Sequence, residues 1–377
     1  MATIDKSLPN NATEIELPEE ETVDATEAVT DTSGDTEVQL DDDGGATVNF
    51  DPTANPLEGG EAHDSNLAEY LDDKVLDPLA SELMDQYTSY KETRGDWEES
   101  YREGLSLLGF KYVNRTEPFK GASSVTHPVL AEAVTQFQAQ AYKELLPSEG
   151  PVRTQILGAV DVPKEEQSKR VKDFMNYQIM DQMKEYEPEF DQMLFYLPLS
   201  GSTFKKVYYD DLLDRAVSKF VPAEDLVVPY SATSLEDAEA VIHVLRISQN
   251  DLRKQQINGF YRDIDLGEPP LQEDQLKQKE LELEGIRQNG SEDMYTILEM
   301  HVNIDLDGYE DVNPEDGEPT GIRLPYIVTI DEANGKVLSI RRNYEADDAL
   351  KKKKDYFVHF KFLPGLGFYG FGLIHMI

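Results

Sequence analysis

The chain has 377 residues, 39% of them hydrophobic, which is enough for two domains with cores of ordinary size. Its formal net charge of −40 argues against a surface that grips nucleic acid by neutralising phosphates. It has no cysteine, which excludes disulfides, thiolate nucleophiles and cysteine-based zinc or iron–sulfur sites.

The first 65 residues are the most acidic part of the chain. They hold 18 acidic residues and one basic residue, Lys6, a net charge of −17. They are rich in Asp, Glu, Thr, Gly and Pro and have no hydrophobic period, so we predict a disordered acidic tail at 1–65. The alternative is an acidic arm that docks on a basic partner. No apolar run follows a basic start, so no secretory signal is predicted.

Residues 66–290 are predicted to be a helical and mixed region. Apolar residues recur at helical spacing in five segments: 66–94 despite Pro78, 96–110, 128–147, 164–186 with Val171, Phe174 and Met175 on one face, and 188–201. Strand patterns follow at 203–210, 215–230 and 238–248, then a helix at 248–263 with Ser248 as N-cap. Residues 271–290 form a highly charged helix with little apolar face, so it is solvated or held by partners.

Residues 291–350 switch to a period of two, which is typical of strands joined by turns. The predicted strands fall at 294–308, 321–335 and 336–345, with a hairpin signal at Ala333-Asn334-Gly335. The fold class is therefore α+β, with helices first and a β-rich module at 291–350.

Residues 351–377 end in YFVHFKFLPGLGFYGFGLIHMI, the most apolar stretch of the chain. Its uncharged part begins at Leu363 and contains Pro364 and four glycines, so it is not a membrane span, which needs about 20 mostly apolar residues in a helix. We predict a buried strand from Tyr356 to Leu363, followed by a glycine-rich bend.

The best metal candidate is NIDLDGYEDVNPE, residues 303–315. Asn303, Asp305, Asp307 and Gly308 match the first, third, fifth and sixth positions of a calcium loop. The twelfth position should be a bidentate glutamate, but it is Pro314, and the segment follows a strand pattern. A polar hairpin tip is the preferred interpretation, and no metal site is predicted.

No catalytic residue or cofactor site is predicted, and the chain is not expected to be an enzyme. No histidines are spaced four apart as in a helical metal site, and His243, His301 and His359 lie in strand patterns where a structural role is favoured. The nucleophile elbow and the phosphate loop are both absent from the sequence. Lys351–Lys354 could contact phosphate, but a solvated loop that offsets local negative charge is preferred.

Three segments together resemble the portal proteins of tailed bacteriophages, specifically the large portal family of short-tailed phages. The first is DWEESYREGLSLLGF followed by EPFKGASSVTHPVLAEAVTQFQAQAYKELLPSEGPV, where a Gly-Ala-Ser turn and a His-Pro lead into a long helix. The second is FVPAEDLVVPYSATSLEDAEAVIHVLRISQNDL, and the third is the closing stretch from Tyr356. In the family this last phrase leads into a long helix, so the resemblance implies a chain truncated at its C-terminus.

The resemblance implies a homo-oligomeric ring, usually of twelve subunits, at one vertex of the capsid, assembled in the host cytoplasm and present in the virion. Double-stranded DNA passes through its channel during packaging and ejection without sequence-specific binding. The implied partners are the terminase large subunit, the head-completion and tail adaptor proteins, and the scaffolding and major capsid proteins, with no membrane. Residues 66–290 would form the wing with part of the stem, 291–350 the clip, and 351–377 the lead into a stem helix.

Two other functions are compatible with the sequence. One is an acidic interaction or DNA-mimic protein, for which residues 1–65 would bind a basic partner. The other is a calcium-dependent hydrolase that uses Asp305 and Asp307.

Overall fold

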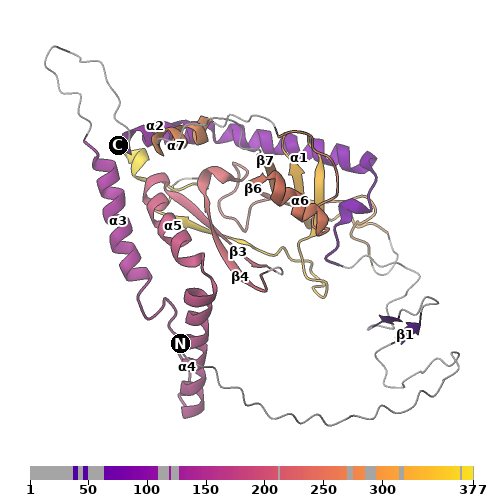
Figure 1. Ribbon diagram of the computed structural model, residues 1–377, viewed down its shortest axis with the longest axis horizontal. Helices are drawn as coiled ribbons and strands as arrows, with labels where there is room; N and C mark the ends of the chain where they lie inside the picture. Colours follow the sequence, from indigo (N-terminus) through magenta and orange to yellow (C-terminus); the bar gives the residue numbers. More distant parts are fainter. Residues whose placement is uncertain are drawn as a thin grey trace, which may run out of the picture. The chain divides into compact units, whose positions relative to one another are not determined.

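The computed structural model describes residues 37–40, 46–49, 63–108, 119, 127–210, 213–269, 275–284, 294–313, 318–365 and 367–376. The chain divides into two compact units, Met1–Glu61 and Ala62–Ile377. In the second unit helices come first and antiparallel sheets follow, so the predicted α+β class is confirmed (Figure 1). Among the described residues, no helix is both long and apolar enough to cross a membrane.

In the first unit two short strands pair within the predicted tail. β1 (Glu37–Leu40) and β2 (Ala46–Asn49) are antiparallel, with Val38 opposite Val48. The sequence predicts no regular structure here, so this strand pair departs from the expected tail. The remaining residues of that prediction, up to residue 62, lie outside the described residues.

The larger sheet of the second unit has five antiparallel strands. Their order is β5 (Leu226–Val227), β6 (Ala240–Ser248), β7 (Met294–Ile304), β8 (Leu324–Asp331) and β9 (Val337–Arg342). β6 pairs with β7 along its whole length, from Ala240 opposite Val302 to Ser248 opposite Met294. The strands of 291–350 thus form one sheet with β5 and β6, across the expected boundary at 290.

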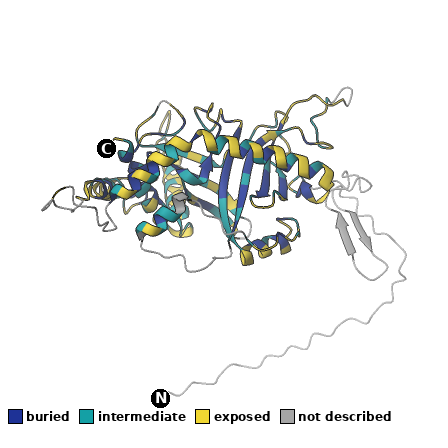
Figure 2. Cartoon of the chain, turned by 90° about the horizontal axis from the view of Figure 1, so that it is seen from above, coloured by how far each residue is buried: buried dark blue, intermediate teal, exposed yellow. Residues whose placement is uncertain are grey.

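Both faces of this sheet are covered. Helix α1 (Asp73–Thr93) and the short η1 (Leu67–Glu69) cover one face, where Leu76 and Leu83 join a core with Met300. Helix α6 (Gln249–Ile257) covers part of the other face. Figure 2 shows exposed residues along the outer side of α1 and buried residues on the strands beneath it. The buried residues of α1, Leu76, Ala80, Leu83 and Tyr87, are three or four positions apart, which is the pattern of an amphipathic helix and explains why this helix is predictable.

The smaller sheet has three antiparallel strands in the order β10 (Phe357–Lys361), β3 (Ser202–Asp210) and β4 (Arg215–Pro222). Helix α5 (Tyr186–Ser200) packs on it through Phe190 and Leu194. The sequence predicts a buried strand from Tyr356 to Leu363. The structure has a strand here, but it is less buried than predicted. β10 is mostly half-buried with Val358 48% exposed, because it is an edge strand that pairs only with β3 within the described part of the chain.

The remaining helices gather around a separate core. It brings together α2 (Gly95–Leu105), η2 (Ser106–Leu108), α3 (Val129–Leu145) and η5 (Leu373–Met376), with Tyr101, Val134 and Ile374 buried between them. Helix α7 (Gln275–Glu284) also reaches this core through Leu283. The charged helix predicted at 271–290 is therefore partly held by the protein's own core, and its ends lie outside the described residues.

Arg94 ties this helical part to the larger sheet. It is 7% exposed and donates hydrogen bonds to the backbone carbonyls of Ala223, Glu224 and Leu226, in and beside the short η4 (Ala223–Asp225). Its Nε donates to the Glu98 carboxylate at 2.7 Å, and Nη1 also lies 3.2 Å from the Tyr369 hydroxyl. A buried guanidinium with all these donors engaged fixes the junction between α1 and α2 against the start of β5.

The sequence predicts two successive helices, at 164–186 and 188–201, and the structure has two, with the first ending earlier than predicted. Helix α4 (Val162–Tyr177) passes into a π-helical turn, η3 (Gln178–Gln182), and the next helix, α5, begins at Tyr186. A helix running unbroken through Lys184 would need the backbone N–H of residue 188 to bond the Lys184 carbonyl. Residue 188 is proline and has no N–H, so the chain starts a new helix with Pro188 in its first turn.

Candidate assembly surface

Residues 150–177, which we call the arm, consist of α4 and the extended segment that precedes it. Asn176 joins the two, because its side chain accepts a hydrogen bond from the Val152 N–H at 2.9 Å and donates one to the Val152 carbonyl at 3.2 Å. Gly150 has φ +89°, and a Cβ at this position would lie 2.3 Å from the Asn176 Oδ1 atom. The arm is therefore built by local contacts, and Gly150 permits the close approach that it needs.

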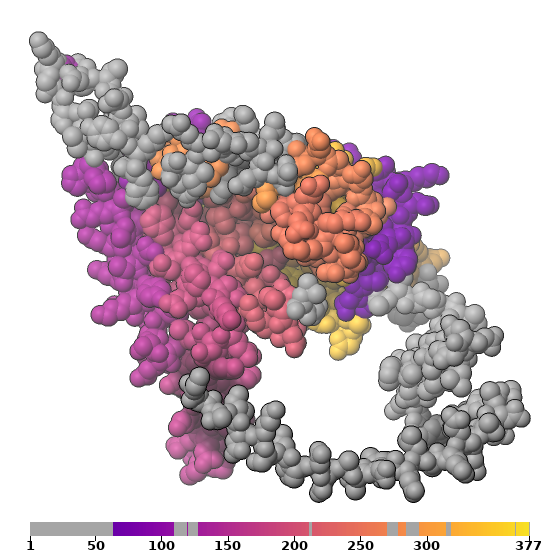
Figure 3. All heavy atoms as spheres, viewed as in Figure 1, coloured from indigo at the N-terminus to yellow at the C-terminus, as the bar shows by residue number. Residues whose placement is uncertain are grey.

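The arm exposes an unusual amount of apolar surface. No residue of α4 is buried, and Phe174 is 58% exposed, although Val171, Phe174 and Met175 form the apolar face that the sequence predicts. Exposed apolar residues continue through the extended segment, where Leu157 is 86% exposed; the others of the arm are Val160, Val162 and Tyr177. Figures 1 and 3 show α4 extending away from the two sheets of its unit. Exposed apolar side chains gathered in one segment are typical of an interaction site.

The arm is also much less acidic than the chain as a whole. It carries five basic and four acidic residues, whereas the rest of the chain carries 30 basic and 71 acidic residues. Lys169 and Arg170 are exposed and have no ion-pair partner among the described residues. Arg170 lies four residues before Phe174, so the basic and apolar side chains share one side of the helix.

A polar centre lies between the two sheets and is largely enclosed: His301 is buried, and the Lys206 and Glu299 side chains are each 15% exposed. The Lys206 ammonium contacts both carboxylate oxygens of Glu299, at 2.6 and 2.7 Å, and the His301 Nε2 atom lies 2.8 Å from the same carboxylate. Burial opposes ionisation of Glu299, but the charge of Lys206 and the hydrogen bond with His301 hold its pKa well below the usual range. Burial lowers the pKa of His301, and it lowers that of neighbouring His243 to about 3.

This centre joins β3 of the smaller sheet to β7 of the larger one. His243 and His301 are in strands, as the sequence predicts, and each packs edge-on against the Phe357 ring. His359 is in strand β10, where it stacks on the Phe204 and Phe368 rings at 4.4 and 4.7 Å. Side chains enclosed in this way suit a structural role, which the sequence analysis favours for all three histidines.

The calcium-loop candidates lie at the end of β7 and in the connection that leads to β8. Asn303 is in β7, Asp305 follows it, and Asp307 and Gly308 form a turn in which Gly308 has φ +88°. β7 and β8 pair in an antiparallel way up to Ile304 opposite Leu324, so the candidates lie at the end of β7 and in the connection between two paired strands, which agrees with the preferred interpretation. In the described part of the chain no three histidine or acidic side chains gather as metal ligands. Pro314 lies outside the described residues.

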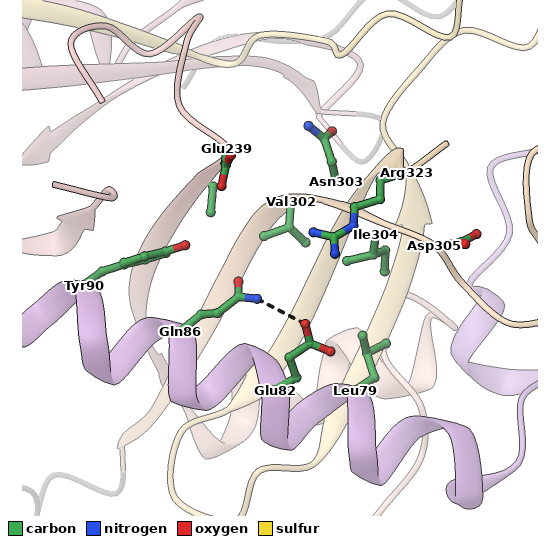
Figure 4. A pocket seen from close by; sticks show the side chains of 11 residues that line it. Leu79, Glu82, Gln86, Tyr90, Glu239, Val302, Asn303, Ile304, Asp305 and Arg323 are labelled. Atoms are coloured by element: carbon green, nitrogen blue, oxygen red, sulfur yellow. Dashed lines mark hydrogen bonds between the residues drawn. The ribbon is translucent and has the colours of Figure 1, made fainter. Parts of the chain in front are cut away.

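A small pocket opens between α1 and the end of β7 (Figure 4). Its volume is about 160 Å³, below the range of roughly 300–1,000 Å³ typical of small-molecule sites. Figure 4 shows the Arg323 guanidinium directed into it, above Glu82 and Gln86 of α1. The Gln86 amide donates to Glu82 at 3.4 Å, so some of the polar lining is satisfied internally. The pocket does not suggest a reaction.

The lysine run at 351–354 is largely paired within the protein. Lys351 contacts Asp311, Lys353 lies 3.7 Å from Asp355, and Lys354 lies 2.9 Å from Glu345. Upstream, Arg341 stacks over the Phe260 ring, and Arg342 donates to the His63 carbonyl; both arginines are thus engaged in internal contacts. These contacts favour the interpretation that the run offsets local negative charge.

No protein-family model matches the chain. No curated protein matches it either. The arm is the feature that the sequence analysis did not single out. Its signal is the mixture of Lys169 and Arg170 with Val171 and Phe174 in a chain that is otherwise strongly acidic.

Proposed function

We propose that this protein is a subunit of a bacteriophage portal, the ring at one capsid vertex through which double-stranded DNA is packaged and ejected. The observation that supports it most directly is the arm, whose helix α4 has no buried residue and exposes Phe174 to 58%. Permanent homo-oligomers bury apolar surfaces of this kind between subunits. The order of the three portal-like segments along the sequence supports the same proposal.

The charge of the chain also suits a conduit for DNA. Each phosphate that a protein neutralises strengthens binding and adds a barrier to sliding, so a channel should not hold the duplex tightly. A chain with net charge −40 repels DNA at long range. In this proposal the ring has no catalysis of its own, and the terminase large subunit docks on it during packaging. Head-completion and tail adaptor proteins bind afterwards, and the scaffolding and major capsid proteins surround it.

Negative-stain electron microscopy of the purified chain tests the proposal. The expected images are rings with an axial hole, and light scattering after size exclusion should give a mass of many subunits. A stable monomer at every concentration from micromolar to hundreds of micromolar would contradict it.

A further inference from the structure

The β3–β4 tip, which we define as Val207, Tyr209, Asp210, Leu213 and Asp214, is a second surface with exposed apolar side chains. Val207 is 42%, Tyr209 58% and Leu213 54% exposed. The tip is held in shape by its own acidic residues, because Asp210 accepts a hydrogen bond from the Leu213 N–H at 3.1 Å and Asp214 accepts one from the Tyr209 hydroxyl at 2.5 Å. The described residues of the tip therefore present apolar groups beside two carboxylates.

The arm and the tip are complementary in both properties. The arm offers Phe174 and Val171 beside Arg170 and Lys169, all exposed, and the tip offers Tyr209 and Leu213 beside two carboxylates. We infer that the arm of one copy of this chain docks on the β3–β4 tip of the next copy. The inference rests on the proposed function in that the partner is another copy of the chain, and it names the two surfaces that meet.

The charges favour contact between an arm and a tip over contact between two arms or two tips. If two arms packed against each other, Lys169 and Arg170 of both copies would meet near the same apolar face, and like charges in contact are unfavourable. Two tips would bring Asp210 and Asp214 together with the same result. Arm against tip sets opposite charges together and is head-to-tail, which is the kind of contact that closes into a ring when the rotation between copies allows.

The absence of cysteine from the chain permits a clean test. One variant carries Phe174→Cys and a second carries Leu213→Cys, both at exposed positions where the substitution should leave the fold intact. Each is purified, checked by circular dichroism, and treated with a short bis-maleimide alone and as an equal mixture. The expected result is a covalent dimer in the mixture at least tenfold above either variant alone.

Two controls make the result specific. Ile257→Cys on α6 is 71% exposed and lies on neither surface, so its mixture with Phe174→Cys should give only the background yield. Adding Arg170→Glu to the Phe174→Cys variant should lower the yield several-fold. Lys336→Glu, at an exposed position outside the arm, should leave the yield unchanged.

Failure of the inference and failure of the proposed function give different results. If the unmodified chain assembles but the mixture cross-links no better than the Ile257→Cys control, the inference is wrong and the portal proposal stands. A strong homodimer of Phe174→Cys alone would also overturn it, because two arms would then meet. If the unmodified chain stays monomeric at every concentration, both fail.

Discussion

The side chain of Asn66 takes the place of a neighbouring strand at the edge formed by Ile340. Its Oδ1 atom accepts a hydrogen bond from the Ile340 N–H at 3.0 Å, and its Nδ2 atom donates to the Leu338 carbonyl at 3.1 Å. Asn66 is 4% exposed, and its Oδ1 also accepts from the Ala68 N–H, which starts η1. The Asn66 carboxamide thus pairs with backbone groups at the edge of β9 and caps the start of η1, although 272 residues separate Asn66 from Leu338.

We expect Asn66→Ala to lower the free energy of unfolding by about 2–3 kcal/mol, since it leaves several buried backbone groups without a partner. Urea denaturation measures the loss, and hydrogen exchange at Ile340 should accelerate. Asn250→Ala, at an exposed position in the first turn of α6, serves as the matched control and should change stability by less than about 0.5 kcal/mol. Equal stability of the two variants would mean that the edge of β9 does not depend on Asn66.

This contact illustrates what could not be predicted from the sequence. The helix around Leu76 and Leu83 and the strands from Met294 onward are predictable, because periods of 3.6 and 2 report which side chains face a core. The role of Asn66 depends on a partner 272 residues away, which no local period records. The same limit applies to the sheet order, in which β6 pairs with β7 across a charged helix and residues outside the described part.

The arm shows the converse limit of periodicity. Val171, Phe174 and Met175 have the spacing of a core-facing helix, yet Phe174 is 58% exposed. An apolar helix face in the sequence indicates that this face is buried against something. It does not indicate whether the residues that bury it belong to the same chain or to another. The sequence predicts one helix up to residue 186 and another from residue 188. The structure moves this break to 183–185, in keeping with the inability of Pro188 to donate to the carbonyl of Lys184.

The buried pair of Lys206 and Glu299 should be sensitive to the loss of either partner. Lys206→Met leaves the Glu299 carboxylate buried without its counter-charge, and we expect a loss of about 3–5 kcal/mol in urea denaturation. Replacing both residues by Met should cost clearly less than the sum of the two single variants. Lys336→Met, whose partner Asp77 is 62% exposed, is the control and should cost less than about 1 kcal/mol. Additive single effects would contradict coupling between the two charges.

Two enclosed histidines, His243 and the half-buried His359, predict a loss of stability in mild acid. Burial lowers the pKa of His243 and of His359 to about 3, from 6.5 for an unperturbed side chain. As the pH falls below 6.5 the unfolded chain binds these protons and the folded chain does not, so the free energy of unfolding falls. The slope is at most about 1.4 kcal/mol per pH unit for each histidine.

The measurement is urea denaturation at several pH values between 7 and 5. The double variant His243→Asn and His359→Asn should show a shallower decline than the unmodified chain. His127→Asn, at an exposed position before α3, should leave the slope unchanged. If the double variant keeps the full slope, these two histidines do not determine the acid sensitivity.

Calcium should not stabilise the protein. Asp305 and Asp307 are both exposed in the connection that follows β7, where the described residues do not form a three-ligand group. Melting temperatures in 1 mM calcium and in chelator should therefore agree within about 1 °C, because a ligand shifts stability only when it binds the folded state. A rise with calcium that disappears in Asp305→Ala would instead support the calcium-dependent alternative.

The glycines of the closing segment are expected to be indispensable at one position and replaceable at another. A Cβ on Gly372 would lie 2.2 Å from the Leu199 carbonyl oxygen and 2.6 Å from the Gly201 nitrogen, so backbone would have to move to admit it. Gly372→Ala should lower the free energy of unfolding by about 1–3 kcal/mol. Gly367→Ala is the matched control, because nothing lies within 4 Å of its added Cβ, and it should change stability by less than about 0.5 kcal/mol.

The same substitution should act locally as well as globally. Gly372 precedes η5, whose Ile374 packs so closely on α2 that a Cβ on Gly104 would lie 2.0 Å from it. Moving the backbone at Gly372 should therefore loosen the contact between Ile374 and α2. Hydrogen exchange should rise at 372–376 and along α2 in Gly372→Ala but not in Gly367→Ala. Unchanged exchange in both variants would mean that the bend tolerates a side chain and that its glycines do not set the packing of η5.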